Sequence, residues 1–235
     1  MTMQQRIESV RQRIAQAALA AGRDPGEITL CAATKVQTDD TIREAIAAGI
    51  TVCGENRVQE LTAHLAAGAY EGAQVHFIGH LQTNKVNKVV GHVSLIHSVD
   101  SQRLLEAIQR QAEKVGVVQD VLLEVNIAGE ESKGGCTPDL ARELAAQALE
   151  MDHVRLRGLM AIPPISPEPG ANVPFFAAMK QLFVDIKGNM AHNQDDMDCL
   201  SMGMSGDFED AIAQGATLVR VGTALFGPRP PMGQK

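Results

Sequence analysis

The chain has 235 residues, a length that fits one large α/β domain. Hydrophobic residues make up 45% of it and aromatic residues 3%, which predicts a core of Ala, Val, Ile and Leu. The formal net charge of −7 argues against nucleic-acid binding, and no apolar run reaches the roughly 20 residues of a membrane-spanning helix.

The first segment, residues 1–24, has the apolar periodicity of a helix and not the continuous apolar stretch of a signal peptide. We therefore expect a soluble, cytoplasmic protein that begins with a helix.

After this segment, short β-branched runs alternate with Ala-rich amphipathic segments. Strands are predicted over 28–35, 50–55, 75–79, 94–100, 118–127, 154–162, 198–203 and 217–227. Helices are predicted over 38–49, 55–68, 83–91, 101–116, 137–150, 174–190 and 206–215. This strict alternation is typical of a parallel sheet with crossover helices.

Eight parallel strands joined by right-handed crossovers close most simply as a barrel. We therefore predict one α/β domain over 1–235, a single parallel (β/α)8 TIM-type barrel with an additional N-terminal helix. The alternative is an open doubly wound sheet. It is disfavoured because no GxGxxG motif follows the first strand, and because glycines gather near the last two strands.

Two further segments stand out by their proline content. Residues 162–174 follow the sixth strand, so they lie at the barrel mouth either as a stiff connector or as an active-site lid. Residues 228–235 are expected to form a flexible tail.

The four cysteines and seven histidines suggest neither a disulfide framework nor a metal site. No two cysteines form a CxxC pair, and His76 and His80 flank a strand end instead of sharing one helical face. We expect no bound metal.

Lys35 is the first residue with a plausible chemical role. It ends the first strand, where catalytic groups of barrels lie, and shares an inward face with Cys31 and Ala33. An amine in partly apolar surroundings has a lowered pKa and reacts with carbonyls. On spacing alone, a surface lysine with a packed stem explains the pattern better.

A phosphate-binding cradle near the last two strands changes this balance. Ser205 and Gly206 follow the seventh strand, and Gly222 and Thr223 follow the eighth, at the place where barrels commonly bind phosphate. The alternation of the eighth strand points Arg220 into the barrel, where a cation needs a partner such as a ring nitrogen or an acidic side chain. An amine, a phosphate cradle and a buried cation facing one cavity suggest pyridoxal 5′-phosphate (PLP) more than a sugar phosphate.

At this point the chain closely resembles the pyridoxal phosphate homeostasis protein family, single-barrel relatives of the alanine racemase N-terminal domain. The matching segments occur in family order over nearly the whole chain. They are AATK (32–35), GENRVQE (54–60), HFIGHLQTNK (76–85), HSVDS (97–101), LLEVNIAGEESKGG (122–135), GLMAIPP (158–164), SMGMSGDFEDAI (201–212) and VRVGTALFG (219–227).

The resemblance implies an internal aldimine between PLP and Lys35 and a set of further cofactor contacts. Ser205, Gly222 and Thr223 would hold the phosphate, and Arg220 would face the pyridine nitrogen. Additional pocket residues and weaker candidates are Asn56, Met202, Met204, His80, Gln82, Lys85 and Lys133. The chain departs from the family at Arg57, where Tyr often follows GEN, and at SKGGC, where an aliphatic residue usually follows SKSG or SKGG.

These residues do not favour catalysis, so we expect no catalytic residue. Arginine stays protonated and disfavours a second positive charge on the adjacent ring nitrogen, which weakens PLP as an electron sink. Racemases with this barrel take a second base, a Tyr, from an additional domain, whereas the only Tyr here is Tyr70, in a helix-end segment.

We therefore expect a non-catalytic, monomeric carrier that buffers PLP and passes it to PLP-dependent apo-enzymes. The alternatives are a weak PLP-dependent amino-acid racemase and a phosphosugar aldolase that uses Lys35 directly.

Overall fold

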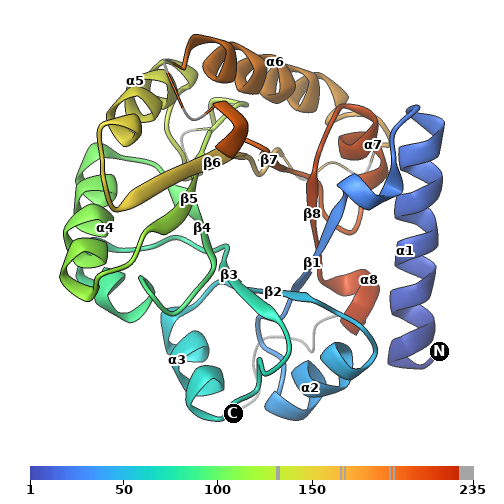
Figure 1. Ribbon diagram of the computed structural model, residues 1–235. Coiled ribbons are helices and arrows are strands. Elements are labelled where there is room, and N and C mark those ends of the chain that lie inside the picture. The colour runs from blue at the N-terminus through green and yellow to red at the C-terminus, as the bar shows by residue number, and fades with distance from the viewer. Residues whose placement is uncertain (131–132, 165, 167, 191, 193, 228–235) are drawn as a thin grey trace.

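The computed structural model describes residues 1–130, 133–164, 166, 168–190, 192 and 194–227. Its strands form a closed parallel barrel in the order β1-β2-β3-β4-β5-β6-β7-β8, which confirms the predicted TIM-type fold. Figure 1 looks into the ring of strands, with the helices outside it. The strands are β1 (Thr29–Ala33), β2 (Val52–Glu55), β3 (Gln74–Phe77), β4 (Leu95–Val99), β5 (Gln119–Glu124), β6 (Val154–Met160), β7 (Cys199–Ser201) and β8 (Leu218–Val221).

The helices follow the predicted alternation, with shorter pieces at the strand ends. The α-helices are α1 (Met3–Ala20), α2 (Asp39–Ala47), α3 (Val58–Ala66), α4 (Gln102–Val115), α5 (Pro138–Leu149), α6 (Val173–Asn189), α7 (Phe208–Ala213) and α8 (Thr223–Phe226). The 3-10 helices are η1 (Pro25–Glu27), η2 (Thr83–Lys88) and η3 (Gln194–Asp196).

Several predicted boundaries were wrong, among them the following three. The predicted strand 217–227 ends at Val221, and the apolar run after Gly222 forms α8 instead. The predicted strand 28–35 ends at Ala33, so Lys35 lies in the following turn. The predicted helix 83–91 is the shorter 3-10 helix η2. β-Branched and aliphatic runs cannot distinguish a strand from a short buried helix, which explains the first error.

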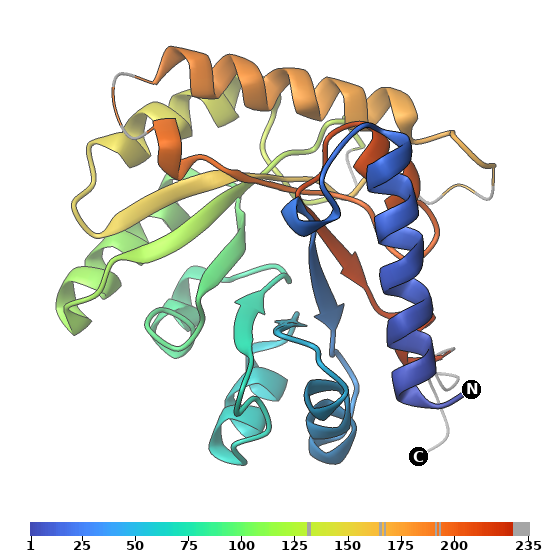
Figure 2. The ribbon, with the colours of Figure 1, turned by 45° about the vertical axis from the view of Figure 1, so that its right-hand side comes forward.

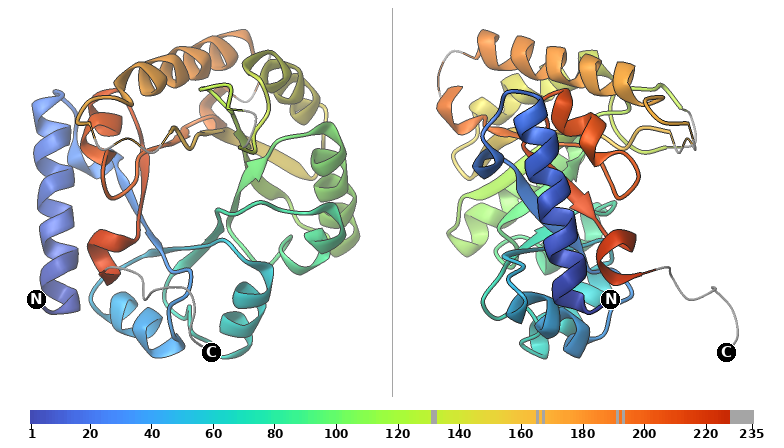
Figure 3. Two further views of the ribbon diagram at one scale, coloured as in Figure 1. Left: turned by 180° about the vertical axis from the view of Figure 1, so that it is seen from behind. Right: turned by 90° about the vertical axis from the view of Figure 1, so that its right-hand side faces the viewer.

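Helix α1 is held by a capping box and by the last helices of the chain. The Thr2 side chain accepts from the Gln5 N–H, and the Gln5 side chain accepts from the Thr2 N–H. Its buried stripe of Ile7, Val10 and Ile14 faces the barrel, and α1 packs against α7 and α8. Arg13 also forms an ion pair with Glu209 of α7. Figures 2 and 3 show α1 beside these helices. The first helix therefore packs directly against the last two helices described.

Close contact between β6 and β7 depends on a glycine. Gly158 has φ +149°, and a Cβ built there would lie 1.8 Å from the Cys199 carbonyl oxygen. No larger residue fits without moving a strand. The pairing of β5 with β6 also shifts register between Val121 and Leu122, so the barrel is locally irregular here.

Aliphatic side chains fill the layer between strands and helices, whereas the barrel interior mixes small and polar residues. Ala32, Cys53 and Val221 are fully buried in the outer layer. Inside the barrel, Cys31 packs with Val52 in a separate small cluster. Within the described residues, no helix is long and apolar enough to cross a membrane.

The proline-containing segment 162–174 joins β6 to α6. Ile165 and Pro167 of this segment, and the predicted tail 228–235, lie outside the described residues.

Candidate functional site

A cavity of about 180 Å³ lies where β1, β7 and β8 end. Three turns supply its lining, at the mouth where barrel enzymes place their active sites. Its side chains come from Ala33, Lys35, Val36, Gln37, Met204, Ser205, Gly206, Arg220, Gly222, Thr223, Phe226 and Gly227. The structure thus brings together most of the cofactor-binding residues predicted from the sequence, although they are far apart in the chain.

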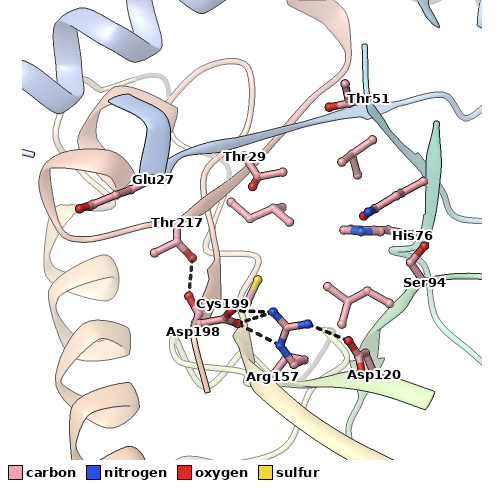
Figure 4. Close-up of a pocket in the computed structure, with 14 residues that line it drawn as sticks. Glu27, Thr29, Thr51, His76, Ser94, Asp120, Arg157, Asp198, Cys199 and Thr217 are labelled. Atoms are coloured by element: carbon pink, nitrogen blue, oxygen red, sulfur yellow. Dashed lines mark hydrogen bonds and ion pairs between the residues drawn. The ribbon is translucent and has the colours of Figure 1, made fainter. Parts of the chain in front are cut away.

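A second cavity, of about 440 Å³, opens at the N-terminal ends of the strands (Figure 4). Its charged cluster is internally paired: Arg157 donates to an Asp120 oxygen at 2.7 Å and to an Asp198 oxygen at 2.6 Å. These carboxylates raise the pKa of Arg157. The described lining residues include no lysine, whereas Lys35 lines the cavity at the other mouth.

Lys35 sits in a strained turn directly after β1. The next residue, Val36, has φ 59°, and it is the only non-glycine residue in the described part of the chain with a positive φ. A β-branched side chain in this region is a genuine outlier, and such strain concentrates at functional sites. The Val36 N–H donates to a Glu60 carboxylate oxygen at 3.0 Å. The neighbouring Thr34 is fully buried and donates to the Gly54 carbonyl from both its N–H and its hydroxyl.

The two small-residue turns after β7 and β8 are tied together by Ser205. Its hydroxyl oxygen accepts from the main-chain N–H groups of Gly222 at 3.2 Å and Ala224 at 3.3 Å. On the other side of the loop, the Asp207 carboxylate accepts from the Met204 N–H at 2.7 Å and from the Asn172 side chain at 2.8 Å. Hydroxyl and N–H donors of both turns therefore meet beside Lys35, and such donors suit an anion.

Arg220 is buried inside the barrel, as the alternation of β8 predicts; its side chain is 4% exposed. It donates to the Ser201 hydroxyl at 2.6 Å and to the Ala161 carbonyl at 2.9 Å. Burial lowers the pKa of Arg220. The sequence led us to expect a ring nitrogen or an acidic side chain as its partner. No carboxylate of the described residues forms an ion pair with it, and its two contacts are neutral acceptors.

Two predicted pocket residues lie away from the cavity. Met202 is fully buried in the hydrophobic layer outside the barrel and does not line the cavity. Asn56 follows β2, and its side-chain oxygen is buried without a hydrogen-bond partner among the described residues. A Cβ at Gly79 would lie 2.1 Å from the Asn56 carbonyl oxygen, which explains the glycine of the HFIG segment. A buried acceptor of this kind is normally satisfied, so Asn56 remains a ligand candidate.

The weaker candidates are also outside the cavity. His80 and Gln82 are exposed, and Lys85 is half-buried, all between β3 and η2 or within η2. Lys133 donates to the Pro163 carbonyl at 3.0 Å and pairs with Glu130 at 2.7 Å. Lys133 therefore links the loop after β5 to the segment after β6.

The pair Glu55 and Tyr70 was not predicted as a unit. Glu55 is fully buried and accepts from the N–H groups of Asn56 and Arg57, and from the Tyr70 hydroxyl at 3.3 Å. The only tyrosine of the chain is thereby fixed among buried side chains. The GEN motif indicated a role for this turn, but only the fold shows that the Glu55 carboxylate binds the turn's own N–H groups.

Glu124 is a second residue that sequence reasoning missed. It ends β5, where its position two residues after the interior Leu122 is the signal that could have found it. Burial raises the pKa of Glu124 to about 7, with a smaller contribution from nearby Asp100 and an opposing one from Arg220. A carboxyl group of this pKa can exchange protons near neutral pH.

No group of three or more His, Cys, Asp or Glu side chains suited to a metal ion occurs in the described residues. The chemistry at the C-terminal mouth therefore consists of an amine, neutral donors, a buried guanidinium and a titratable carboxyl group.

Comparison with known proteins agrees with this arrangement. The family described as "Alanine racemase, N-terminal domain" matches residues 6–230. A pyridoxal phosphate homeostasis protein of Aquifex aeolicus is 44% identical over 227 residues, covering 96% of this chain and 97% of that protein. A pyridoxal phosphate homeostasis protein of Pseudomonas aeruginosa is 41% identical over 228 residues, covering 97% and 96%.

Solved structures show the same fold. PipY of Synechococcus elongatus, solved with PLP bound, is 34% identical with a TM-score of 0.82, covering 96% of this chain and 100% of that one. A Bifidobacterium adolescentis protein described as unknown has a TM-score of 0.89 at 40% identity, with 95% and 94% covered. An alanine racemase of Clostridium difficile at 13% identity has a TM-score of 0.70, covering 94% of this chain and 56% of that one, and shares the fold.

Proposed function

Because this chain belongs to the pyridoxal phosphate homeostasis protein family, we propose that it binds PLP as a Schiff base on Lys35 and acts in PLP homeostasis as a carrier or buffer. PLP is its cofactor. The observation that carries the proposal is the single cavity lined by Lys35, Ser205, Arg220 and Thr223. The relative solved with PLP bound supports the same ligand.

The described residues around the cavity provide the chemical groups that PLP binding requires. Lys35 supplies the amine for the aldehyde. Ser205 and Thr223 supply hydroxyl donors for the phosphate, and Gly222 lines the same cavity with its N–H donating to the Ser205 oxygen. Arg220 has several N–H groups beyond its two protein bonds, which suits an unprotonated ring nitrogen.

The remaining predicted pocket residues have different roles. Met204 lines the cavity and provides an apolar contact. The buried, unpartnered oxygen of Asn56 makes it a polar contact for the cofactor or an associated water. Met202 supports the pocket from behind as part of the packed outer layer.

Non-catalytic behaviour follows from the charge of Arg220. When bound, PLP supplies an aldehyde that condenses with amines and a ring that accepts electron density from the attached group. Electron acceptance is strongest with a protonated ring nitrogen, and a guanidinium beside that nitrogen disfavours the proton. Arg220 therefore favours storage over turnover.

A weak racemase is the second candidate, and Glu124 is the observation that favours it. Racemisation needs proton donors and acceptors on both faces of the substrate carbon. Tyr70 does not suit this role because it is buried and bonded to Glu55. Glu124, with a pKa of about 7, is a chemically suitable group at the same mouth of the barrel.

Reductive trapping tests the binding proposal. Borohydride treatment of the PLP-loaded protein should add one reduced cofactor to the intact mass, and peptide mapping should find it on Lys35. The Lys35→Ala variant is the matched control and should lose both the visible absorbance band and the adduct. Labelling of a different lysine, or of none, would refute the proposal, and an unlabelled protein that still cleaves a phosphosugar would indicate an aldolase.

Incubation with single-enantiomer amino acids separates the carrier from the racemase. A carrier gives no more enantiomer exchange than Lys35→Ala, whereas turnover well above that control would establish the racemase. We further propose that the protein is a cytoplasmic monomer that delivers PLP to apo-enzymes. Light scattering on the purified protein and reactivation of a PLP-free enzyme by the loaded protein measure these two points.

A further inference from the structure

A chain of hydrogen-bonded side chains crosses the inside of the barrel, beginning at Arg220. The Arg220 guanidinium donates to the Ser201 hydroxyl at 2.6 Å. Ser201 Oγ lies 3.1 Å from His97 Nδ1, and His97 Nε2 lies 3.0 Å from His76 Nδ1. These four residues, here called the barrel relay, come from β8, β7, β4 and β3.

The barrel relay is buried along its length. Ser201 and His97 are fully buried, and Arg220 and His76 are 4% and 5% exposed. Buried charge is tolerated only with hydrogen bonds that replace its hydration. Because Arg220 has no ion-pair partner among the described residues, Ser201 and the Ala161 carbonyl carry this role.

The donors and acceptors favour one direction along the relay. Arginine only donates, so Ser201 accepts from Arg220, and its own hydrogen has His97 Nδ1 as the single remaining partner among the described residues. His97 Nδ1 then accepts, which leaves the hydrogen on Nε2 to be donated to His76 Nδ1. Burial lowers the pKa of His97 and lowers that of His76 to about 4, so both rings are neutral at pH 7.

The relay ends at the cavity on the other side of the barrel. Figure 4 shows the His76 ring on the wall of this N-terminal cavity. In the derived direction His76 carries its hydrogen on Nε2, and no hydrogen bond from the described residues reaches that atom. The last donor therefore faces the cavity, where solvent can accept it.

We propose that Ser201 and His97 are positioning residues that hold Arg220 in place for the cofactor, through a hydrogen-bond chain directed from Arg220 to the N-terminal cavity. This inference rests on the proposed function, because Arg220 matters here as the partner of the PLP ring. Because hydrogen bonds in a chain polarise one another, the bond that Ser201 donates to His97 strengthens the bond that Ser201 accepts from Arg220. Arg220 thereby keeps its position and its charge without a carboxylate that would occupy its remaining N–H groups.

Removal of the Ser201 hydroxyl tests the positioning role. Ser201→Ala should weaken PLP affinity by about tenfold to hundredfold, the loss for one hydrogen bond to a charged group, and should shift the absorbance of bound PLP. Ser201→Thr, which keeps the hydroxyl, should restore both. Ser98→Ala is the matched control, because Ser98 is also fully buried, lies one residue from His97 and has no hydrogen-bond partner among the described residues.

The proposal is overturned if Ser201→Ala keeps the wild-type affinity and spectrum, or if Ser98→Ala shows the same loss. A second measurement uses the wild-type protein without cofactor. ¹⁵N NMR of labelled histidine should show His97 and His76 as neutral rings with hydrogen on Nε2. Hydrogen on Nδ1 of His97 would overturn the derived direction. Failure of the wild type to bind PLP would instead refute the proposed function, while the ring hydrogens would still test the relay.

Discussion

Removing the two hydroxyl groups of the proposed phosphate site tests how this cavity recognises its ligand. In the double variant Ser205→Ala, Thr223→Val, the phosphate loses two donors, each worth about 1.5–3 kcal/mol when the acceptor is charged. New hydrogen bonds to the phosphate offset part of this loss in binding free energy. Ser205 accepts from Gly222 and Ala224 at 3.2 and 3.3 Å, and its removal frees both N–H groups to turn to the phosphate.

Allowing about 1 kcal/mol for the freed N–H groups, we expect a net loss of about 2–5 kcal/mol, or about 30- to 4,000-fold in PLP affinity. Pyridoxal lacks the phosphate, so its affinity should change by no more than about threefold, which is below 1 kcal/mol. Absorbance titration of wild type and variant with both ligands measures the difference. Equal losses for PLP and pyridoxal would refute the assignment of these turns to the phosphate.

Three other perturbations have defined outcomes. Arg220→Glu should still allow reductive trapping on Lys35 but should shift the absorbance of bound PLP and weaken its retention; unchanged spectra and affinity would show that Arg220 does not face the ring. Val36→Gly should raise the melting temperature, because the strain relieved at a left-handed Val, about 1–2 kcal/mol, exceeds the entropic cost of Gly, about 0.5–1 kcal/mol. Val36→Ala should raise the melting temperature less. A lower melting temperature for Val36→Gly would contradict the inferred strain. Glu124→Gln should stabilise the protein by about 3 kcal/mol at pH 8 and not at pH 4. With a folded pKa near 7, above the ordinary 4.5, the folded state holds its proton longer, so wild-type stability falls as pH rises from about 4.5 to 7. Denaturant unfolding at pH 4 and pH 8 measures the free energy of unfolding of both proteins. An equal effect of the substitution at the two pH values would exclude a raised pKa of Glu124.

The order of elements could be predicted because each strand is a short β-branched run and each helix a longer Ala-rich one. The same pattern does not show where each strand ends. Lys35 was expected to end the first strand, yet the chain turns after Ala33, and the strain at Val36 depends on contacts with Glu60 that spacing does not reveal.

The alternation of β8 placed Arg220 inside the barrel correctly, since inward and outward residues alternate along a strand. The same reasoning could not find its partner. Ser201 and His97 are 104 positions apart, and only the closed barrel brings β4 opposite β7. Membership of a motif does not show which way a side chain faces. Of the two methionines predicted for the pocket, Met202 lies in the core and Met204 lines the cavity.

The packing of α1 against α7 and α8, with Arg13 paired to Glu209, has a consequence for synthesis of the chain. β1 pairs with β8, so its edge stays open until the final strand leaves the ribosome. Lys35 is made early, whereas the turns that line the same cavity follow about 170 residues later in the chain. A growing chain therefore carries Lys35 before its cavity exists, and the cavity can form only after β8 has been made.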